Sequence, residues 1–171
     1  MKYKIRKINS SGFGLLEVIV ALGIIITVEV SILSLSASSI KLGTLSRQRT
    51  QATEIARQGL EVVRNIRDSN WASGVLWNNS FTTDDWYKIK FNDVSATNKY
   101  WELIKVVSPT PREETITIDG VNFTREIEIK NKTAKFDDTT DIDYADVKVI
   151  IKWGNTNTKK IEITEYLTNW K

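Results

Sequence analysis

An apolar run near the amino terminus, residues 13–35, constrains the fold of this chain more than any other feature of its sequence. As an α-helix, which rises about 1.5 Å per residue, a run of this length crosses roughly 30 Å of hydrocarbon with some tilt. The 12 residues before the run hold four basic and no acidic side chains, and positive charge favours the cytoplasmic side of a membrane. We therefore expect a single-pass segment with a cytoplasmic amino terminus, and the remaining chain outside.

Two carboxylates interrupt the apolar run. Glu17 lies near its start, and Glu29 lies deeper, with Thr27 and Ser31 nearby in the sequence. An ionised side chain at the centre of a bilayer costs about 2.5–3.5 kcal/mol on insertion scales, so a carboxylate in such a segment is expected to have a partner. For Glu29, pairing within an assembly and simple snorkelling or a local kink are both open.

The sequence at the start of the run, GFGLLE at residues 12–17, resembles the class III signal peptide of type IV prepilins and type II secretion pseudopilins. In that family a membrane peptidase cuts after the glycine that precedes the apolar segment, and the new N-terminal residue is methylated. The resemblance implies cleavage between Gly12 and Phe13, methylation of Phe13, and an assembly role for Glu17 as the fifth mature residue.

Cleavage at this position would change the charge of the helix end. The nitrogen of Phe13 is an amide in the precursor and a free amine afterwards, with a reference pKa of about 7.7–8.0, and N-methylation retains the positive charge. In the family, the glutamate is thought to pair with the N-terminal amine of a neighbouring subunit as subunits leave the membrane. Pairing of Glu17 with its own amine, one helical turn away, is the alternative, and the sequence leaves both open.

Two other interpretations of the apolar run are a conventional secretory signal and a plain uncleaved anchor in which Glu17 is incidental. Residues 36–38, Ser-Ala-Ser, carry small side chains at alternate positions, as a signal peptidase requires. Conventional signals, however, have an apolar region of about 7–15 residues. The longer run here, with its two carboxylates, favours the prepilin-type interpretation.

The composition excludes several kinds of site. The sequence has no cysteine and no histidine, so disulfides, thiol chemistry, zinc sites built from those ligands and imidazole catalysis are excluded. The leader holds four of the 24 Lys and Arg residues, which leaves 20 against 21 acidic residues. This balance removes the charge argument for a nucleic-acid partner. Because no motif organises the remaining Asp and Lys residues, we expect a protein that is not an enzyme and needs no cofactor.

An amphipathic stretch follows the apolar run. From residue 45 onward, apolar and small residues recur at steps of three, four and seven, which indicates one face of a helix. They are Ala52, Ile55, Ala56, Gly59, Leu60, Val62, Val63 and Ile66. No proline occurs before Pro109, so a helix can run from residue 13 to residue 68 without interruption. We expect a sheet to cover its second half.

Past residue 69 the period changes from 3.6 to 2, which predicts short strands. Strand-like runs occupy residues 86–91, 101–107, 115–118, 121–129, 146–153 and 159–167, and residues 131–144 are predicted to form a polar loop. Asp119-Gly120 is a strong signal for a two-residue hairpin turn. A helix followed by a meander of antiparallel strands is an α+β fold, and the family resemblance implies the same pilin-like arrangement of a long N-terminal helix packed on an antiparallel sheet.

We thus expect four parts: a leader (residues 1–12), a membrane or filament-core half of the helix (13–35), an amphipathic half (36–70) and a β head (71–171). The six tryptophans are expected to pack mainly in the core of the head.

Further stretches of the chain, residues 56–71, 146–153 and 164–170, look like minor prepilins of the pilus-modification type. Ser34 stands where many major pilins have a proline, and the C-terminal cysteine pair of major pilins is missing. The resemblance implies a minor pilin or pseudopilin, located in the inner membrane and then in an extracellular or periplasmic filament. Its expected partners are other pilins or pseudopilins, the prepilin peptidase, the inner-membrane assembly platform and the membrane.

Two alternatives concern the head. Asp137, Asp138, Asp141 and Asp143 could supply oxygen ligands to calcium, although Ile142 and Lys148 stand where an EF-hand loop needs glycine and glutamate; a solvated acidic loop is the other interpretation. The head could also make the chain a membrane-anchored or filament-tip binding module for adhesion, DNA uptake or secretion cargo, which the shared signal and helix do not distinguish from a purely structural subunit.

Overall fold

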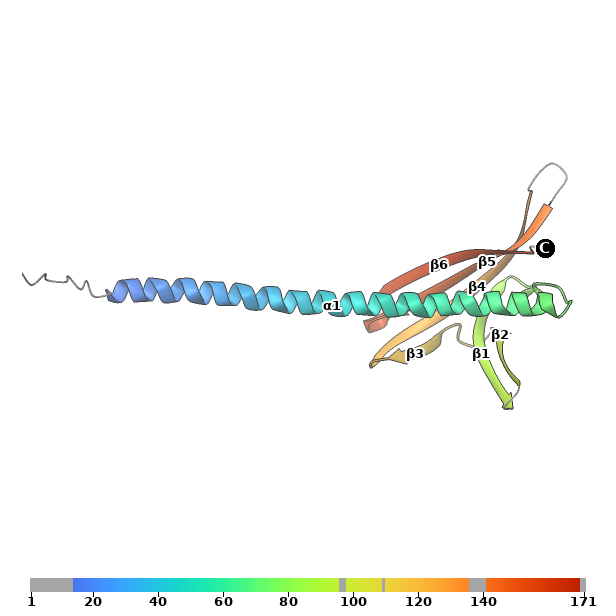
Figure 1. Ribbon diagram of the computed structural model, residues 1–171, viewed down its shortest axis with the longest axis horizontal. Helices are drawn as coiled ribbons and strands as arrows, with labels where there is room; N and C mark the ends of the chain where they lie inside the picture. Colours follow the sequence, from blue (N-terminus) through green and yellow to red (C-terminus); the bar gives the residue numbers. More distant parts are fainter. Residues whose placement is uncertain (1–13, 96–97, 109, 136–140, 170–171) are drawn as a thin grey trace, which may run out of the picture. The chain divides into compact units, whose positions relative to one another are not determined.

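The computed structural model describes residues 14–169 apart from residues 96–97, 109 and 136–140. Figure 1 shows its elements in chain order, which are α1 (Leu15–Ala72), η1 (Asn79–Phe81), β1 (Asp85–Ser95), β2 (Asn98–Lys105), β3 (Glu114–Ile118), β4 (Val121–Lys135), β5 (Asp141–Trp153), η2 (Asn155–Asn157) and β6 (Lys159–Thr168). One long N-terminal helix packed on an antiparallel six-stranded sheet confirms the predicted α+β class.

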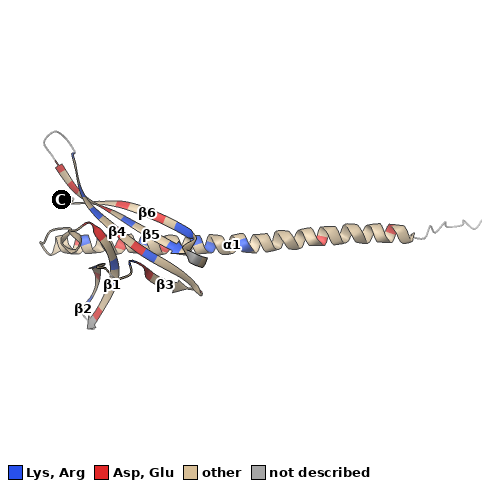
Figure 2. Cartoon of the chain, turned by 180° about the vertical axis from the view of Figure 1, so that it is seen from behind, with Lys and Arg blue, Asp and Glu red and all other residues tan. Residues whose placement is uncertain are grey.

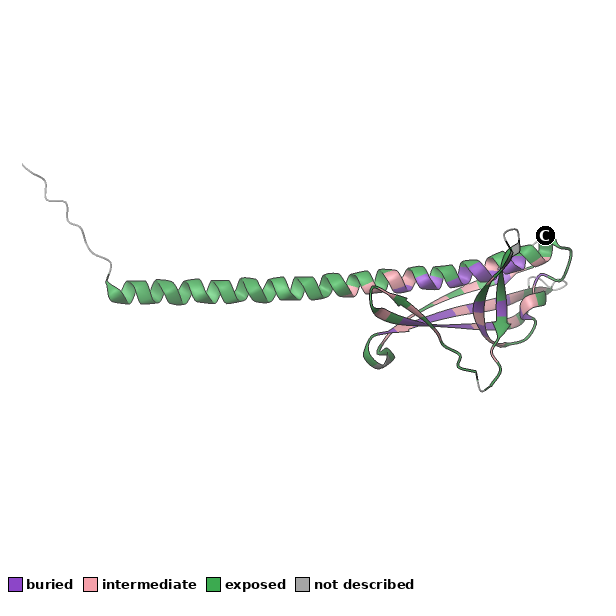
Figure 3. Ribbon diagram, turned by 90° about the horizontal axis from the view of Figure 1, so that it is seen from below, coloured by how far each residue is buried: buried purple, intermediate pink, exposed green. Residues whose placement is uncertain are grey.

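The chain divides into two compact units, residues 1–47 and 48–171. The described part of the first unit is the amino-terminal portion of α1, and every residue from 14 to 44 is exposed (Figure 3). This portion is long and apolar enough to cross a membrane, and none of its most apolar stretch is buried. This finding rests on the length and composition of the helix alone. It agrees with the membrane segment expected from the sequence.

In the second unit, α1 packs on the sheet through the face that its sequence predicted. All eight predicted residues are buried: Ala52, Ile55, Ala56, Gly59, Leu60, Val62, Val63 and Ile66. Gly59 allows the closest approach, because a Cβ at this position would lie 3.2 Å from Cγ1 of Val149 on β5. Arg67 is buried as well, which the apolar pattern alone did not indicate.

The sheet has the order β2-β1-β4-β5-β6, and β3 also pairs with β4. The first third of β4 pairs with β3, from Ile118↔Val121 to Glu114↔Arg125, and a later part of β4 pairs with β1. Alternate residues of the strands face the helix and complete the core. The largest fully buried side chains of the strands are Phe123, Ile127, Ile129, Val147, Val149, Ile151, Trp153 and Leu167.

The predicted hairpin turn at Asp119-Gly120 is confirmed. Both residues have positive φ, 52° and 76°, and Ile118 pairs with Val121 directly across the turn. Two successive residues with positive φ are typical of the turn that matches the twist of a two-stranded ribbon, and glycine adopts this conformation without steric cost.

The prediction of a polar loop over residues 131–144 is wrong at both of its ends. β4 continues to Lys135 and β5 begins at Asp141, and the two strands stay in register from Asn131↔Ala145 to Lys135↔Asp141. Polar cross-strand contacts accompany this extension, including a 2.8 Å hydrogen bond from the Thr133 hydroxyl to Asp143. The β4 side of this ribbon, residues 131–135, carries polar residues on both faces and lacks the alternation by which the other strands were predicted. The β5 side, residues 141–144, does alternate, but its apolar residues Ile142 and Tyr144 are only partly buried.

Several other boundaries differ from the prediction. α1 ends at Ala72 rather than near residue 68, and β1 and β2 form a longer hairpin than residues 86–91 and 101–107 suggested. The expectation that tryptophans pack in the core holds for Trp77 and Trp153, whereas Trp71 is 50% exposed and Trp101 is 37% exposed. Trp71 lies in the last turn of α1, and Trp101 lies opposite Phe91 on the β1–β2 hairpin, where the two ring centroids are 4.8 Å apart.

A buried ion pair joins β3 to β4 beneath the helix. The Nε and NH2 groups of Arg125 donate hydrogen bonds of 3.0 and 2.8 Å to one carboxylate oxygen of Glu114. The Arg125 side chain is only 5% exposed, and its NH1 group has no hydrogen-bond partner. A buried charge depends on its partner, because loss of the partner leaves the charge uncompensated in a poorly solvated site.

We expect Glu114→Ala to lower the free energy of unfolding of the head by about 2 kcal/mol, since it strands the buried guanidinium of Arg125. Arg125→Met should cost less, because it removes the buried charge and retains most of the packing, while Glu114 is partly solvated. Urea denaturation followed by tryptophan fluorescence measures both. Glu54→Ala is the control: its pair with Arg57 is exposed, so stability should hardly change. An equal loss in Glu114→Ala and Glu54→Ala would contradict the prediction.

Candidate functional site

Of the predicted processing and assembly residues, Gly12 and Phe13 lie outside the described residues, and Glu17 lies in the first turn of α1. The backbone N–H of Glu17 donates a 2.9 Å hydrogen bond to the carbonyl of Gly14. Its carboxylate is exposed, and no ion pair joins it to another described residue. An acidic side chain at this end of a helix is favoured by the unpaired N–H groups and the helix dipole. The carboxylate is thus available to a cationic partner.

Glu29 is exposed on the same apolar portion of α1, which Figure 2 shows as a helix with long uncharged stretches between isolated acidic positions. The hydroxyls near it in sequence are engaged elsewhere. Thr27 donates a 2.8 Å hydrogen bond to the carbonyl of Gly23, and Ser31 donates one of the same length to the carbonyl of Thr27. Neither hydroxyl therefore donates a hydrogen bond to the carboxylate of Glu29.

The face of the sheet that points away from α1 carries a network of alternating charges across β4, β5 and β6. Lys148 lies 3.2 Å from Glu162 and 4.0 Å from Glu128, Lys132 lies 2.9 Å from Asp146, and Lys152 pairs with Glu126. The lysines are partly exposed in these pairs, whereas Glu126, Asp146 and Glu128 are largely buried beside them. Their arrangement gives this face a mixed charge rather than a patch of one sign.

These contacts also shift the pKa values of the paired groups. Hydrogen bonds from Lys160 and Lys148 lower the pKa of Glu162, and the hydrogen bond to Glu162 raises the pKa of Lys148. The hydrogen bond to Asp146 raises the pKa of Lys132 in the same way. A lowered carboxyl pKa contributes stability above its ordinary value that is lost in acid, and a raised lysine pKa contributes stability that is lost in alkali. Both shifts favour the charged forms of Glu162, Lys148 and Lys132 in the neutral range.

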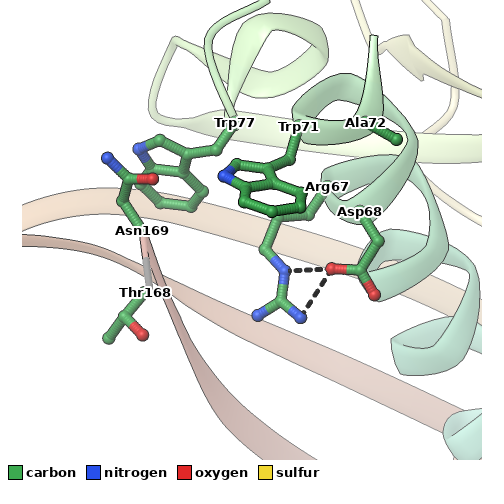
Figure 4. Close-up of a pocket in the computed structure, with 7 residues that line it drawn as sticks. All are labelled: Arg67, Asp68, Trp71, Ala72, Trp77, Thr168 and Asn169. Carbon is green, nitrogen blue, oxygen red and sulfur yellow. Dashed lines mark hydrogen bonds and ion pairs between the residues drawn. The ribbon is translucent and has the colours of Figure 1, made fainter. Parts of the chain in front are cut away.

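A hollow of about 320 Å³ lies at the carboxyl end of α1, next to the end of β6 (Figure 4). Its lining residues are Arg67, Asp68, Trp71, Ala72, Trp77, Thr168 and Asn169. The guanidinium of Arg67 is bonded to Asp68 through Nε and NH2, each at 2.8 Å. The indole rings of Trp71 and Trp77 form most of the apolar wall. The hollow thus offers an aromatic surface beside one ion pair.

The predicted calcium ligands are not brought together in the described part of the chain. Asp137 and Asp138 lie outside the described residues. Asp141 and Asp143 lie at the start of β5, and Asp143 accepts the hydrogen bond from Thr133. Among the described residues, no group of three or more acidic side chains is close enough to hold a metal ion.

Comparison with known proteins identifies no relative, since no family model, no curated protein and no solved structure matches this chain.

Proposed function

We propose that this chain is a minor pilin or pseudopilin, a structural subunit of a type IV pilus-like filament. A prepilin peptidase would process it, and it would assemble through its N-terminal helix with other pilins or pseudopilins. The observation that carries the proposal is the division of α1 into two halves. One half is apolar and exposed from residue 14 to residue 44, and the other forms the core of the β head.

The exposed half requires an apolar environment, which a bilayer supplies before assembly and a bundle of neighbouring helices supplies afterwards. The basic leader favours an inner-membrane orientation with the amino terminus in the cytoplasm. The head would then lie outside, first at the membrane and later on an extracellular or periplasmic filament. Besides the membrane, the partners required by this route are the peptidase and the inner-membrane assembly platform.

Glu17 would act in the transfer from the bilayer to the filament. Cleavage after Gly12 creates a cationic amine at Phe13, one helical turn from Glu17. In an apolar environment, both charges are costly when apart and are stabilised when paired. Pairing between the carboxylate of one subunit and the amine of its neighbour therefore favours the associated helices over the separate ones.

A second candidate function is that of a membrane-anchored or filament-tip binding module. The half-exposed Trp71 beside the hollow at the end of α1 favours it, because aromatic side chains with a polar neighbour are common in recognition surfaces. The two functions share the same anchor, so they differ only in whether the head has a ligand of its own.

The proposed function predicts a mature chain that begins with methylated Phe13 and retains the apolar helix. Mass spectrometry of membrane-extracted protein should find an N-terminal peptide that has lost the 12-residue leader and gained the mass of one methyl group. Gly12→Leu should leave the precursor uncut. Gly14→Ala is the control and should be cut normally, since an added Cβ there meets nothing within 4 Å. A mature start near Ser39 would refute the proposal.

A further inference from the structure

Glu29 lies at the middle of the apolar portion of α1. Between Glu17 and Lys41 it is the only ionisable residue, and it lies 12 positions from each of them, which is about 18 Å along a helix. Glu17 and Lys41 are thus about 36 Å apart, slightly more than the roughly 30 Å hydrocarbon layer. The structure shows an exposed stretch of α1 from residue 14 to residue 44, which is longer than the run of residues 13–35 expected from the sequence and is centred on Glu29. When this stretch is centred in the bilayer, Glu17 and Lys41 reach the two headgroup regions and the carboxylate of Glu29 lies at the midplane.

The helix surface around Glu29 is entirely aliphatic. The residues one turn away on either side are Ile25, Ile26, Ile32 and Leu33, and each is at least 51% exposed. Thr27 and Ser31 are two positions away and so lie on the opposite side of the helix, where their hydroxyls are bonded to its own carbonyls. Within the described residues, therefore, nothing on α1 stabilises the carboxylate.

Reorientation of the side chain does not remove this cost. The headgroup region begins about 15 Å from the midplane, which is beyond the reach of a glutamate side chain on an upright helix. A carboxylate at this depth is stabilised by a partner that lies at the same depth. Because the chain itself supplies none among its described residues, the partner belongs to another molecule.

We infer that the face of α1 around Glu29 docks, within the bilayer, against a transmembrane helix of a different chain that carries a basic side chain at the midplane. This inference rests on the proposed function, since it requires the helix to be inserted. The aliphatic residues around Glu29 would supply the packing, and the ion pair would fix the partner and the register. A single polar residue in an apolar helix interface has this effect in coiled coils.

A second copy of the same chain does not complement this face. Two copies held parallel by the same bilayer place their Glu29 carboxylates at the same depth, where like charges repel each other. The nearest cation on the described part of the apolar helix, Lys41, lies about 18 Å away in depth. Charge complementarity thus favours a different chain as the partner of this face, which in the proposed filament is another kind of pilin or pseudopilin subunit.

The test uses the full chain in phosphatidylcholine vesicles and a synthetic 23-residue Leu/Ala helix as the probe, of a length that spans the bilayer (~20 residues). Gly43→Cys introduces the only cysteine of the sequence at a position where a side chain meets nothing within 4 Å, and it carries the fluorescence donor. The probe carries the acceptor and has lysine, or leucine as a control, at its centre. A third probe has its lysine two turns nearer to one end.

Energy transfer should show association with the central-lysine probe at least about tenfold tighter than with the leucine probe or the displaced-lysine probe. Glu29→Gln should abolish this preference, and Glu29→Lys should reverse it in favour of a probe with central glutamate. Thr27→Val is the matched control on the opposite side of the helix and should retain the preference.

Equal association of the lysine and leucine probes would overturn the inference, as would a preference that survives Glu29→Gln. Tighter association between two copies of the chain than with the lysine probe, if lost in Glu29→Gln, would make a second copy the partner and overturn it as well. Failure of the chain to insert into the vesicles would overturn both this inference and the proposed function, whereas insertion without the lysine preference would overturn the inference alone.

Discussion

Removal of residues 1–42 should leave a soluble head that unfolds cooperatively, whereas removal of residues 1–72 should cause aggregation. Among the described residues, the shorter deletion takes away only exposed ones, and the second compact unit begins at residue 48. The longer deletion also takes away the helix face that covers the sheet. Its large buried side chains are Ile55, Leu60, Val62, Val63 and Ile66.

The size of the expected effect follows from this burial. Each large aliphatic side chain contributes about 1.5–3 kcal/mol when it is fully buried, so five of them contribute on the order of 10 kcal/mol. This equals the whole stability of a typical domain, about 5–15 kcal/mol. The longer deletion also exposes the inner face of the sheet, including Phe123, Ile127 and Val149, as a continuous apolar patch.

Sedimentation and urea denaturation of the two deletions measure this difference. Within the shorter deletion, Val63→Asp should reproduce the unfolding, because Val63 is fully buried and an unpaired carboxylate is costly there. Gln58→Asp is the matched control on the exposed side of the same helix and should remain folded. A soluble, cooperatively folded chain that begins at residue 73 would mean that α1 is not part of the core.

The parts of the fold that could be predicted from sequence are the elements whose buried residues recur at one regular spacing, either helical or alternating. The eight apolar or small positions of α1 between residues 52 and 66 recur at helical spacing and are all buried. Alternation marked β5, where Val147, Val149, Ile151 and Trp153 are buried on one face. In both cases a single element determines which of its residues turn inward.

The parts that could not be predicted depend on partners distant in the sequence. The ribbon at residues 131–135 and 141–144 is held by backbone pairing, and its β4 side is mostly polar and exposed, so that strand shows no buried face. Arg125 is buried because β3 brings Glu114 beside it, and this pairing is not visible in either segment alone.

The candidate site also has parts that the sequence predicts and parts that only the structure reveals. Glu17 and Glu29 stood out in the sequence because each is a charge in an apolar run, and the structure adds what surrounds them. Glu17 lies at the start of the helix, where the helix dipole favours a carboxylate. Glu29 is surrounded on its helix face by aliphatic side chains, and no described residue forms an ion pair with it. In the proposed filament, Glu17 would act at the cleaved end of the helix and Glu29 within the bundle of helices.

In the proposed filament, Glu17→Ala should insert into the membrane at least as well as the unmodified chain and yet be largely excluded from filaments. The substitution replaces a charged side chain near the start of the apolar segment with a neutral one, and a charge never favours insertion of such a segment, so insertion does not suffer. It also removes the carboxylate that would pair with the N-terminal amine of a neighbour. Loss of an ion pair worth about 1.4 kcal/mol or more in an apolar bundle corresponds to at least a tenfold loss of incorporation.

Carbonate extraction measures insertion, and quantitative immunoblotting of sheared, purified filaments measures incorporation. Glu54→Ala is the matched control, because Glu54 also lies on α1 but in the head, where its side chain is 63% exposed; both its insertion and its incorporation should be unchanged. Leader removal should be measured in each variant, so that a processing defect is separated from an assembly defect. If processed Glu17→Ala entered filaments as efficiently as the unmodified chain, the amine–carboxylate pairing would not drive assembly of this subunit. The apolar packing of α1 would then have to hold it in the filament without that ion pair.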